Sequence, residues 1–223
     1  MSFTYKLIKP CIYANNMVIC KRERKIDKMT NYEVIREICK ENNGIVTASM
    51  VAEKEVPSWY LSDMVKKGEL VRVARGIYGT NEGDYDDYYF FQLRNGRCIF
   101  SYASALHLHG LTDRVPFQKE VTVYKGYNSS HITDNTTIHH VNKDIYELGI
   151  TDCTTVFGNR VKVYDKERTI CDLIYSRKDI DVEIFSKAIK TYTSDPERDY
   201  KKLREYAKKM KIADKLDDIL EVI

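Results

Sequence analysis

Three residue types that form hydrolytic triads occur close together in the second half of the chain: Ser101, a histidine at His107 or His109, and Asp113. In such a triad the histidine takes the serine proton and the carboxylate orients the imidazole. Ser101, however, stands at an expected helix start, where capping already accounts for a serine. The chain also lacks the Gly-x-Ser-x-Gly turn that exposes a nucleophile. We therefore expect no catalytic triad.

Metal binding by the neighbouring histidines fails on geometry. His107 and His109 are two apart on an expected helix, which places them about 200° apart around its axis. His139 and His140 are adjacent on an expected strand and point to opposite faces, so neither pair can chelate one ion. The cysteines are scattered without a Cys-x-x-Cys pair, which favours free thiols over disulfides or structural zinc. They are Cys11, Cys20, Cys39, Cys98, Cys153 and Cys171.

The run DKERTICD, residues 165–172, holds acidic and basic groups that could be imagined as a nuclease centre. Structural roles are favoured instead, with Asp165 as a helix cap and Glu167 and Arg168 in surface or interdomain ion pairs. No Gly-x-x-x-x-Gly-Lys-Ser/Thr loop is present to hold a nucleotide, and the aromatic pairs at 88–91 are more typical of a core than of a base-stacking platform. The sequence thus predicts no catalytic residue, no metal and no cofactor.

A different chemistry is indicated by VPSWYLSDMVKKGELVRVARGIYGT, residues 56–80. Lys66 and Lys67 come at the end of an expected helix, and Arg72 and Arg75 lie on an expected ribbon. Cations so placed can position the phosphates of a DNA backbone, while polar groups on the helix face base edges in a major groove. The predicted DNA-contacting residues are Thr47, Ser58, Trp59, Tyr60, Ser62, Lys66, Lys67, Arg72 and Arg75.

The elements that must position these side chains follow one another regularly from Met29 onwards. Thr30 and Glu33 form a capping box, and the apolar residues after them supply one face of a helix that ends at Gly44. A short extended pair follows. Thr47 then provides an N-cap for a second helix over residues 48–54.

A third helix opens at Pro57, whose fixed φ suits a first helical turn, and ends at Gly68. The sequence then alternates like a strand, turns at Arg75-Gly76 and resumes as a second strand. Three helices closed by such a ribbon predict a winged helix-turn-helix. Because residues 29–80 hold seven basic and seven acidic residues, a winged helix that contacts protein instead of DNA stays open as an alternative.

The second half of the sequence predicts a mixture of helices and short strands. Helices are expected over 84–96, from Ser101 to His109 with Gly110 as the stop, after Asp165, and near 181–192, 199–211 and 214–222. Strands are expected in the β-branched runs 119–126, 136–141, 154–157 and 160–164. The helix near 199–211 is basic, which is typical of a solvated face but could also mark a second surface for DNA or a partner.

Charge is distributed unevenly along the 223 residues, although the net charge is only +3. Residues 1–28 hold seven basic and two acidic residues, so this arm could track phosphates. It could equally be a solvated extension, because Met17 or Met29 could be the biological start. No apolar run approaches a membrane span and no secretory signal is recognisable, so a cytosolic protein is expected.

Three stretches resemble the AbiEi-type antitoxins, which are abortive-infection proteins of type IV toxin-antitoxin systems. GIVTASMVAEKEVPSWYLSDMVKKGELVRVARGIYGT looks like their N-terminal winged helix. FSYASALHLHGLTD (100–113) and YDKERTICDLI (164–174) resemble later family segments in the expected order. The resemblance implies a repressor that binds its own promoter and counteracts a nucleotidyltransferase-like toxin through its C-terminal domain. Where recognition helices of the family tend to carry several arginines, this one has Trp59 and Asp63.

The sequence therefore predicts an α+β protein: a basic arm over residues 1–28, a winged helix-turn-helix over 29–80 and a mixed α/β antitoxin domain over 81–223. The expected partners are double-stranded promoter DNA with inverted repeats, because one winged helix reads only a short site, and the toxin. The alternative is a nuclease whose winged helix delivers the substrate. Dependence on a divalent metal separates the two.

Overall fold

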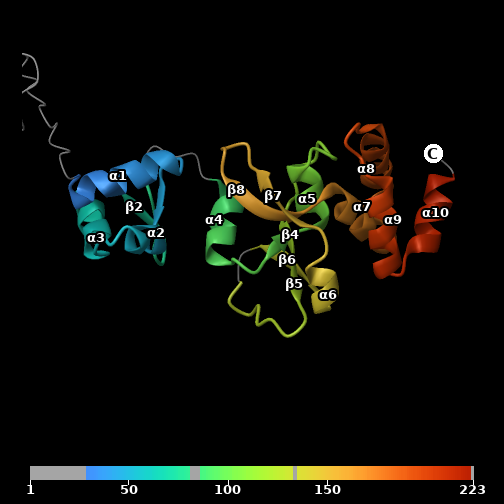
Figure 1. Cartoon of the computed structure of the whole chain (residues 1–223), viewed down its shortest axis with the longest axis horizontal. Coiled ribbons are helices and arrows are strands. Elements are labelled where there is room, and N and C mark those ends of the chain that lie inside the picture. Colours follow the sequence, from blue (N-terminus) through green and yellow to red (C-terminus); the bar gives the residue numbers. More distant parts are fainter. Residues whose placement is uncertain (1–28, 81–85, 133–134, 222–223) are drawn as a thin grey trace, which may run out of the picture.

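The computed structural model describes residues 29–80, 86–132 and 135–221, and its strands form two separate sheets (Figure 1). We call residues 29–80 the N-terminal unit and residues 86–221 the C-terminal unit. The first holds a three-stranded sheet of order β1-β3-β2, and the second a five-stranded sheet of order β6-β5-β4-β8-β7. Helices together with these sheets confirm the predicted α+β class. Within the described residues, no helix is long and apolar enough to cross a membrane.

The N-terminal unit has the predicted order of a winged helix-turn-helix. Its elements are α1 (Asn31–Glu41), β1 (Ile45–Thr47), α2 (Ala48–Glu53), α3 (Trp59–Lys66), β2 (Val71–Ala74) and β3 (Ile77–Gly79). The capping box is present: Glu33 N donates to Thr30 Oγ1 over 3.3 Å, and Thr30 N donates to Glu33 Oε2 over 2.6 Å. These two bonds satisfy main-chain donors that the first turn of a helix leaves unpaired.

One apolar cluster joins the three helices of this unit. Ile35 on α1 and Leu61 and Met64 on α3 are buried in it, together with Val51 on α2. Each such side chain contributes on the order of 1.5–3 kcal/mol through the apolar surface it removes from water. The opposite side of α3 is thereby held towards solvent.

The wing is held against the helices by its own hydrogen bonds. β3 is the central strand and pairs antiparallel with β1 and with β2, with an irregularity between Arg72 and Ala74. The turn at Arg75-Gly76 needs a left-handed residue, and Gly76 supplies it with φ of +74°. Gly76 O accepts from Ala48 N over 2.8 Å, which fixes the turn to the start of α2.

The predicted start of the third helix was wrong by two residues. Pro57 and Ser58 precede α3, and the tighter bonds Tyr60 N to Pro57 O and Leu61 N to Ser58 O form a single turn before it. Glu55 takes φ of +58° in the connection from α2, which brings the chain round within a few residues. The helix-turn-helix is thus built by a left-handed residue followed by a proline turn.

The C-terminal unit is a mixed sheet with helices around it. Its strands are β4 (Ile99–Phe100), β5 (Lys119–Tyr124), β6 (Thr136–Val141), β7 (Ile150–Thr154) and β8 (Arg160–Tyr164). β5 runs parallel to β6 and antiparallel to β4, β4 runs parallel to β8, and β7 and β8 form an antiparallel hairpin. The run 154–157 was predicted as a strand, but only Thr154 belongs to one, because residues 156–158 make the hairpin turn.

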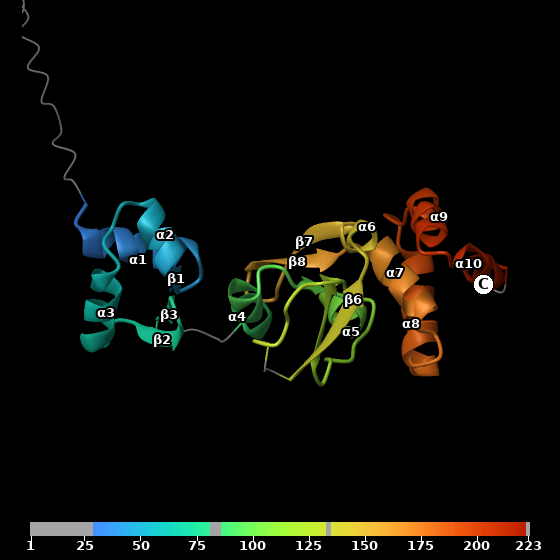
Figure 2. The same ribbon diagram turned by 90° about the horizontal axis from the view of Figure 1, so that it is seen from below.

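The helices of this unit are α4 (Asp87–Arg94), α5 (Tyr102–Leu108), α6 (Lys143–Tyr146), α7 (Lys166–Tyr175), α8 (Val182–Ser194), α9 (Tyr200–Lys209) and α10 (Ala213–Leu220). The short elements β4 and α6 were not predicted, nor was β7 apart from Thr154. α7 lies between the sheet and the group α8–α10 (Figures 1 and 2). Residues 167–174 of α7 are all buried, so this helix is the centre of the unit.

Arg168 is the largest fully buried side chain, with 1% of its surface exposed. Its Nε donates to Asp172 Oδ1 over 2.9 Å, and its Nη1 donates to Leu148 O over 3.0 Å and to Ile145 O. Its guanidinium also stacks 4.2 Å from the centre of the Tyr164 ring. Arg168 was expected in a surface or interdomain ion pair, which is wrong: its pair is internal and ties α7 to the connection between α6 and β7.

Glu167 is buried as well, on the side of α7 that faces α8 and α9. It accepts from Tyr192 OH over 3.2 Å and from Asp199 N over 3.2 Å, and Lys202 Nζ lies 3.4 Å from its Oε2. The predicted surface role of Glu167 is therefore also wrong. Asp165 does cap α7, as expected, by accepting from Arg168 N over 2.8 Å.

The close approach of two segments at Gly149 completes this arrangement. Gly149 takes φ of +79°, and a Cβ at that position would lie 2.8 Å from the Cβ of Arg168 and 3.1 Å from the carboxylate of Asp165. Any side chain at Gly149 would push α7 away from β7.

We predict that Arg168→Ala lowers the free energy of unfolding by about 3–5 kcal/mol, because it leaves Asp172 and two main-chain oxygens buried without their donor. Chemical denaturation followed by circular dichroism measures this. Arg160→Ala, at an exposed position of β8, is the control and should change the free energy by less than about 0.5 kcal/mol. Equal, small effects of both substitutions would contradict the role given to Arg168.

Candidate nucleic-acid interface

The solvent-facing side of α3 carries most of the predicted base-reading residues. Ser58, Trp59 and Ser62 are exposed there, and 55% of the Trp59 surface is accessible. Tyr60 is half-buried, stacked on Trp59 with ring centres 3.8 Å apart and set edge-on against Tyr32 of α1 at 4.9 Å. The start of α3 thus presents a supported aromatic pair beside two hydroxyl groups.

Thr47 is the exception among the predicted contacts. Only 7% of its surface is exposed, and its Oγ1 accepts from Met50 N over 3.2 Å as the N-cap of α2. The same hydroxyl lies 2.9 Å from Ser49 Oγ. Its side chain is therefore occupied in holding the start of α2.

The two lysines at the end of α3 differ in their surroundings. Lys67 Nζ lies 2.7 Å from Asp63 Oδ2 and donates to Tyr32 OH over 3.1 Å. These bonds, the one to Asp63 first, raise the pKa of Lys67, and the same pair lowers the pKa of Asp63. Lys66 is exposed and, within the described part of the chain, has no ion pair. Only Lys66 offers an unmatched charge at this end of the helix.

The ribbon provides two more unmatched cations. Arg72 on β2 and Arg75 in the turn are exposed, and neither forms an ion pair with any residue that the structure describes. Glu69 N and Leu70 N donate to Met64 O, so β2 follows directly from the end of α3. α3 and the ribbon lie along the same edge of the N-terminal unit (Figure 2).

Predicted contacts by the basic arm, residues 1–28, lie outside the described residues. Cys11 and Cys20 also lie there, while Cys39, Cys98, Cys153 and Cys171 are free thiols. Burial raises the pKa of Cys39 and of Cys98 to about 11, so these thiols are poor nucleophiles.

The structure does not bring the triad residue types into catalytic contact. Ser101 is buried and accepts from Thr122 Oγ1 over 2.9 Å, so the expected side-chain cap on α5 is absent. Asp113 pairs with Lys187 of α8. His109 lies 2.6 Å from a main-chain oxygen through its Nε2, and burial lowers its pKa. Each group is held by a partner outside the supposed triad.

The adjacent histidines of β6 point to opposite faces of the strand, as expected. His139 on β6 lies 3.0 Å from Glu120 Oε2 through its Nε2, whereas His140 is exposed on the other face of the strand. In residues 29–80, 86–132 and 135–221 no three His, Cys, Asp or Glu side chains are grouped so as to hold a metal ion.

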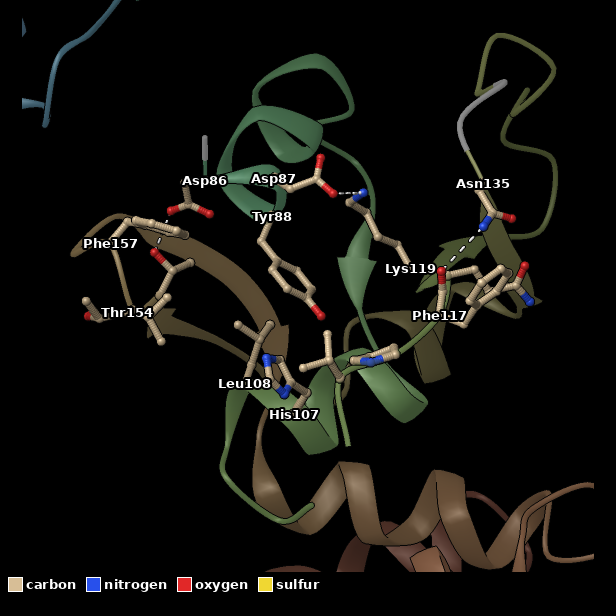
Figure 3. Close-up of a pocket in the computed structure, with 15 residues that line it drawn as sticks. Asp86, Asp87, Tyr88, His107, Leu108, Phe117, Lys119, Asn135, Thr154 and Phe157 are labelled. Atoms are coloured by element: carbon tan, nitrogen blue, oxygen red, sulfur yellow. Dashed lines mark hydrogen bonds and ion pairs between the residues drawn. The ribbon is translucent and has the colours of Figure 1, made fainter. Parts of the chain in front are cut away.

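A cavity of about 490 Å³ lies between the start of α4, the end of α5 and two loops (Figure 3). Its charged groups are paired: Lys119 Nζ lies 2.5 Å from Asp87 Oδ2, and Asp86 accepts from Thr155 and Asn159. Its rim is apolar, with Phe117 95% and Val156 93% exposed. Their exposure could not be predicted from the sequence, because the neighbouring residues resemble those around the buried apolar residues of nearby strands. The cavity suits apolar contact better than proton transfer.

Comparison with known proteins bears on the N-terminal unit. Residues 33–80 match the family described as "Transcriptional regulator, AbiEi antitoxin". This range runs from the first turn of α1 to the end of the wing, so the resemblance to AbiEi-type antitoxins is confirmed over the winged helix. Members of this family are transcriptional regulators and antitoxins.

Comparisons over the whole chain add little. No curated protein matches it. Among solved structures, the RV2827C protein from Mycobacterium tuberculosis is 12% identical, with a TM-score of 0.44, over 82% of this chain and 76% of that chain.

We predict that Lys66→Ala and Arg75→Ala each weaken binding to all DNA sequences and reduce the slope of log affinity against log salt by about one unit, because each removes one phosphate contact. The double variant Asp63→Asn and Lys67→Ala should leave the slope unchanged, because the two charges already cancel each other. Ser62→Ala should alter sequence preference instead. Fluorescence anisotropy over a salt series measures all four variants.

Lys190→Ala, at an exposed position of α8, is the control for lost charge alone. Wild-type affinity and slope in the Arg75 variant would show that the wing does not touch the backbone. A drop for the Asp63/Lys67 double variant as large as that for Lys66→Ala would contradict the assignment of the ion pair.

Proposed function

We propose that the chain is an AbiEi-type antitoxin. In this proposal it represses its own operon by binding inverted repeats in the promoter, and it counteracts a nucleotidyltransferase-like toxin through its C-terminal unit. The observation that carries the proposal is that the family match of residues 33–80 coincides with a complete winged helix whose unmatched cations lie at the end of α3 and on the ribbon. We place both activities in the cytoplasm, which the free thiols support.

DNA binding would follow from the two surfaces of α3. Its buried face is fixed by Leu61 and Met64, so the polar face can enter a major groove without moving the core. Ser58 and Ser62 then offer hydroxyl groups to base edges, and Trp59 offers an apolar edge to a thymine methyl group. Lys66 and the ribbon arginines hold the flanking phosphates, which sets the register.

The C-terminal unit is proposed as a separable domain with its boundary near residue 80. It has its own sheet and a core centred on α7. Between the described residues of the two units, Asn43 Nδ2 donates to Phe157 O and to Asn159 Oδ1, each over 3.1 Å. A small shared apolar cluster also packs Phe90, with Tyr89 and Leu93, against Ile45 and Ile77. Units joined this sparingly can act independently.

We predict that the protein binds the DNA upstream of its own gene in preference to unrelated DNA at physiological salt, that binding weakens steeply as salt rises, and that a chelator has no effect. A mobility-shift assay with and without chelator measures this. Equal binding to unrelated DNA would refute the operator proposal. Degradation of the DNA only when a divalent metal is present would favour a nuclease.

Assigning DNA binding to the N-terminal unit and toxin neutralisation to the C-terminal unit leads to a separate prediction. A fragment of residues 81–223 should rescue cells that express the cognate toxin, while residues 1–80 should keep some operator binding without rescue, because the main apolar cluster of each unit lies within that unit. The toxin is expressed from an unrelated promoter, so that repression cannot help. Rescue by residues 1–80 alone would overturn the assignment.

A further inference from the structure

A second, larger cavity of about 920 Å³ opens in the C-terminal unit between β6, the start of α5 and the ends of α7 and α9. It is remote from the winged helix and shares no lining residue with the cavity of Figure 3. Its volume is in the range of pockets that hold a small molecule with several functional groups. Three kinds of group line it: a buried carboxylate, which we call the floor, a set of exposed lysines, the rim, and a set of aromatic rings, the wall.

The floor contains an acceptor without a donor. Asp172 lines the cavity and is 1% exposed; its Oδ1 accepts from Arg168, but its Oδ2 has no hydrogen-bond partner in the described structure. Burial raises the pKa of Asp172 to about 6, although Arg168 opposes the rise. An unsatisfied buried oxygen costs free energy, so this position favours a ligand that donates a hydrogen bond, directly or through one water.

The rim carries the opposite chemistry. Lys125 after β5 and Lys209 and Lys211 at the end of α9 are exposed at the cavity mouth, and within the described residues none of them has an ion pair. Asp144 also lines the cavity and is the exposed acidic residue near these lysines. Three unmatched ammonium groups around one concave opening attract a ligand with several negative charges.

One wall is aromatic. The Tyr102 ring stacks on the His139 ring with centres 3.9 Å apart and planes 29° apart. Tyr175 at the end of α7 lines the same cavity with an exposed ring. Tyr102 is only 8% exposed and supports the His139 ring from behind, so the accessible rings of the wall are those of His139 and Tyr175. Flat, accessible rings stack on nucleobases regardless of base identity.

We propose that this cavity binds a nucleoside triphosphate, with its phosphates at Lys125, Lys209 and Lys211, its base against the aromatic wall and a base or sugar donor directed to Asp172. A nucleotide combines a polyanionic phosphate chain, a planar base and hydrogen-bond donors. The lysines, the aromatic wall and Asp172 match these three parts in turn. We propose binding of the nucleotide only, with no reaction of it. The site shares no residue with the proposed DNA-contacting surface.

The test is isothermal titration of the full-length protein with ATP, GTP and inorganic triphosphate. Nucleotides should bind at least about tenfold more tightly than triphosphate, because only they use the wall and the floor. The double variant Lys209→Gln and Lys211→Gln should bind nucleotides about tenfold more weakly. The control variant, Lys201→Gln and Lys208→Gln, removes the same charge from exposed positions on the same helix that do not line the cavity, and should bind like wild type.

Tyr175→Ala removes an exposed ring without touching the core. It should reduce the difference in affinity between nucleotides and inorganic triphosphate. If neither ATP nor GTP bound at millimolar concentration, the proposal would be overturned. It would also be overturned by triphosphate binding as tightly as nucleotide, which would leave a phosphate site only, or by equal losses in the two double variants, which would indicate charge attraction without a site.

Discussion

Inside the C-terminal unit, the guanidinium of Arg168 is removed from water and contacts a carboxylate on its own helix, one main-chain oxygen of α6, one of the α6–β7 connection and the face of Tyr164. A buried cation is tolerated only when it is paired in this way. The requirement fixes the distance between α7 and β7, and Gly149 is the residue that permits it. On the other side of α7, Glu167 makes the corresponding contacts with α8 and with the start of α9.

The same principle, charge matched by charge, sets the surface of the N-terminal unit. This unit is electrically neutral, yet its acidic groups are placed so that they cancel some cations and spare others: Asp63 holds Lys67, and Glu69 holds Arg36. Lys66, Arg72 and Arg75 remain unmatched at one edge. A small net charge thus tells little about DNA binding, because the field that a phosphate meets depends on which charges are already paired.

Local signals in the sequence were sufficient for most elements. The Thr30–Glu33 capping box and the Arg75-Gly76 turn each need only neighbours in the chain, and both are present. What could not be predicted depends on distant residues. Glu167 is buried because Tyr192 and Asp199 reach it from α8 and from the start of α9. The ion pair of Lys67 with Asp63 is likewise held by Tyr32 of α1, whose hydroxyl bonds to both. The exposure of Phe117 and Val156 likewise follows from how two loops fold, not from their own sequence.

The most direct test of DNA recognition by α3 and the ribbon is an NMR titration of the ¹⁵N-labelled protein with a duplex from its own upstream region. The account predicts that backbone amide signals of residues 58–66 and 72–76 shift first and most, while those of α8 and α10 stay in place. Shifts confined to the C-terminal unit, with the amides of α3 and the ribbon unmoved at saturating DNA, would contradict it.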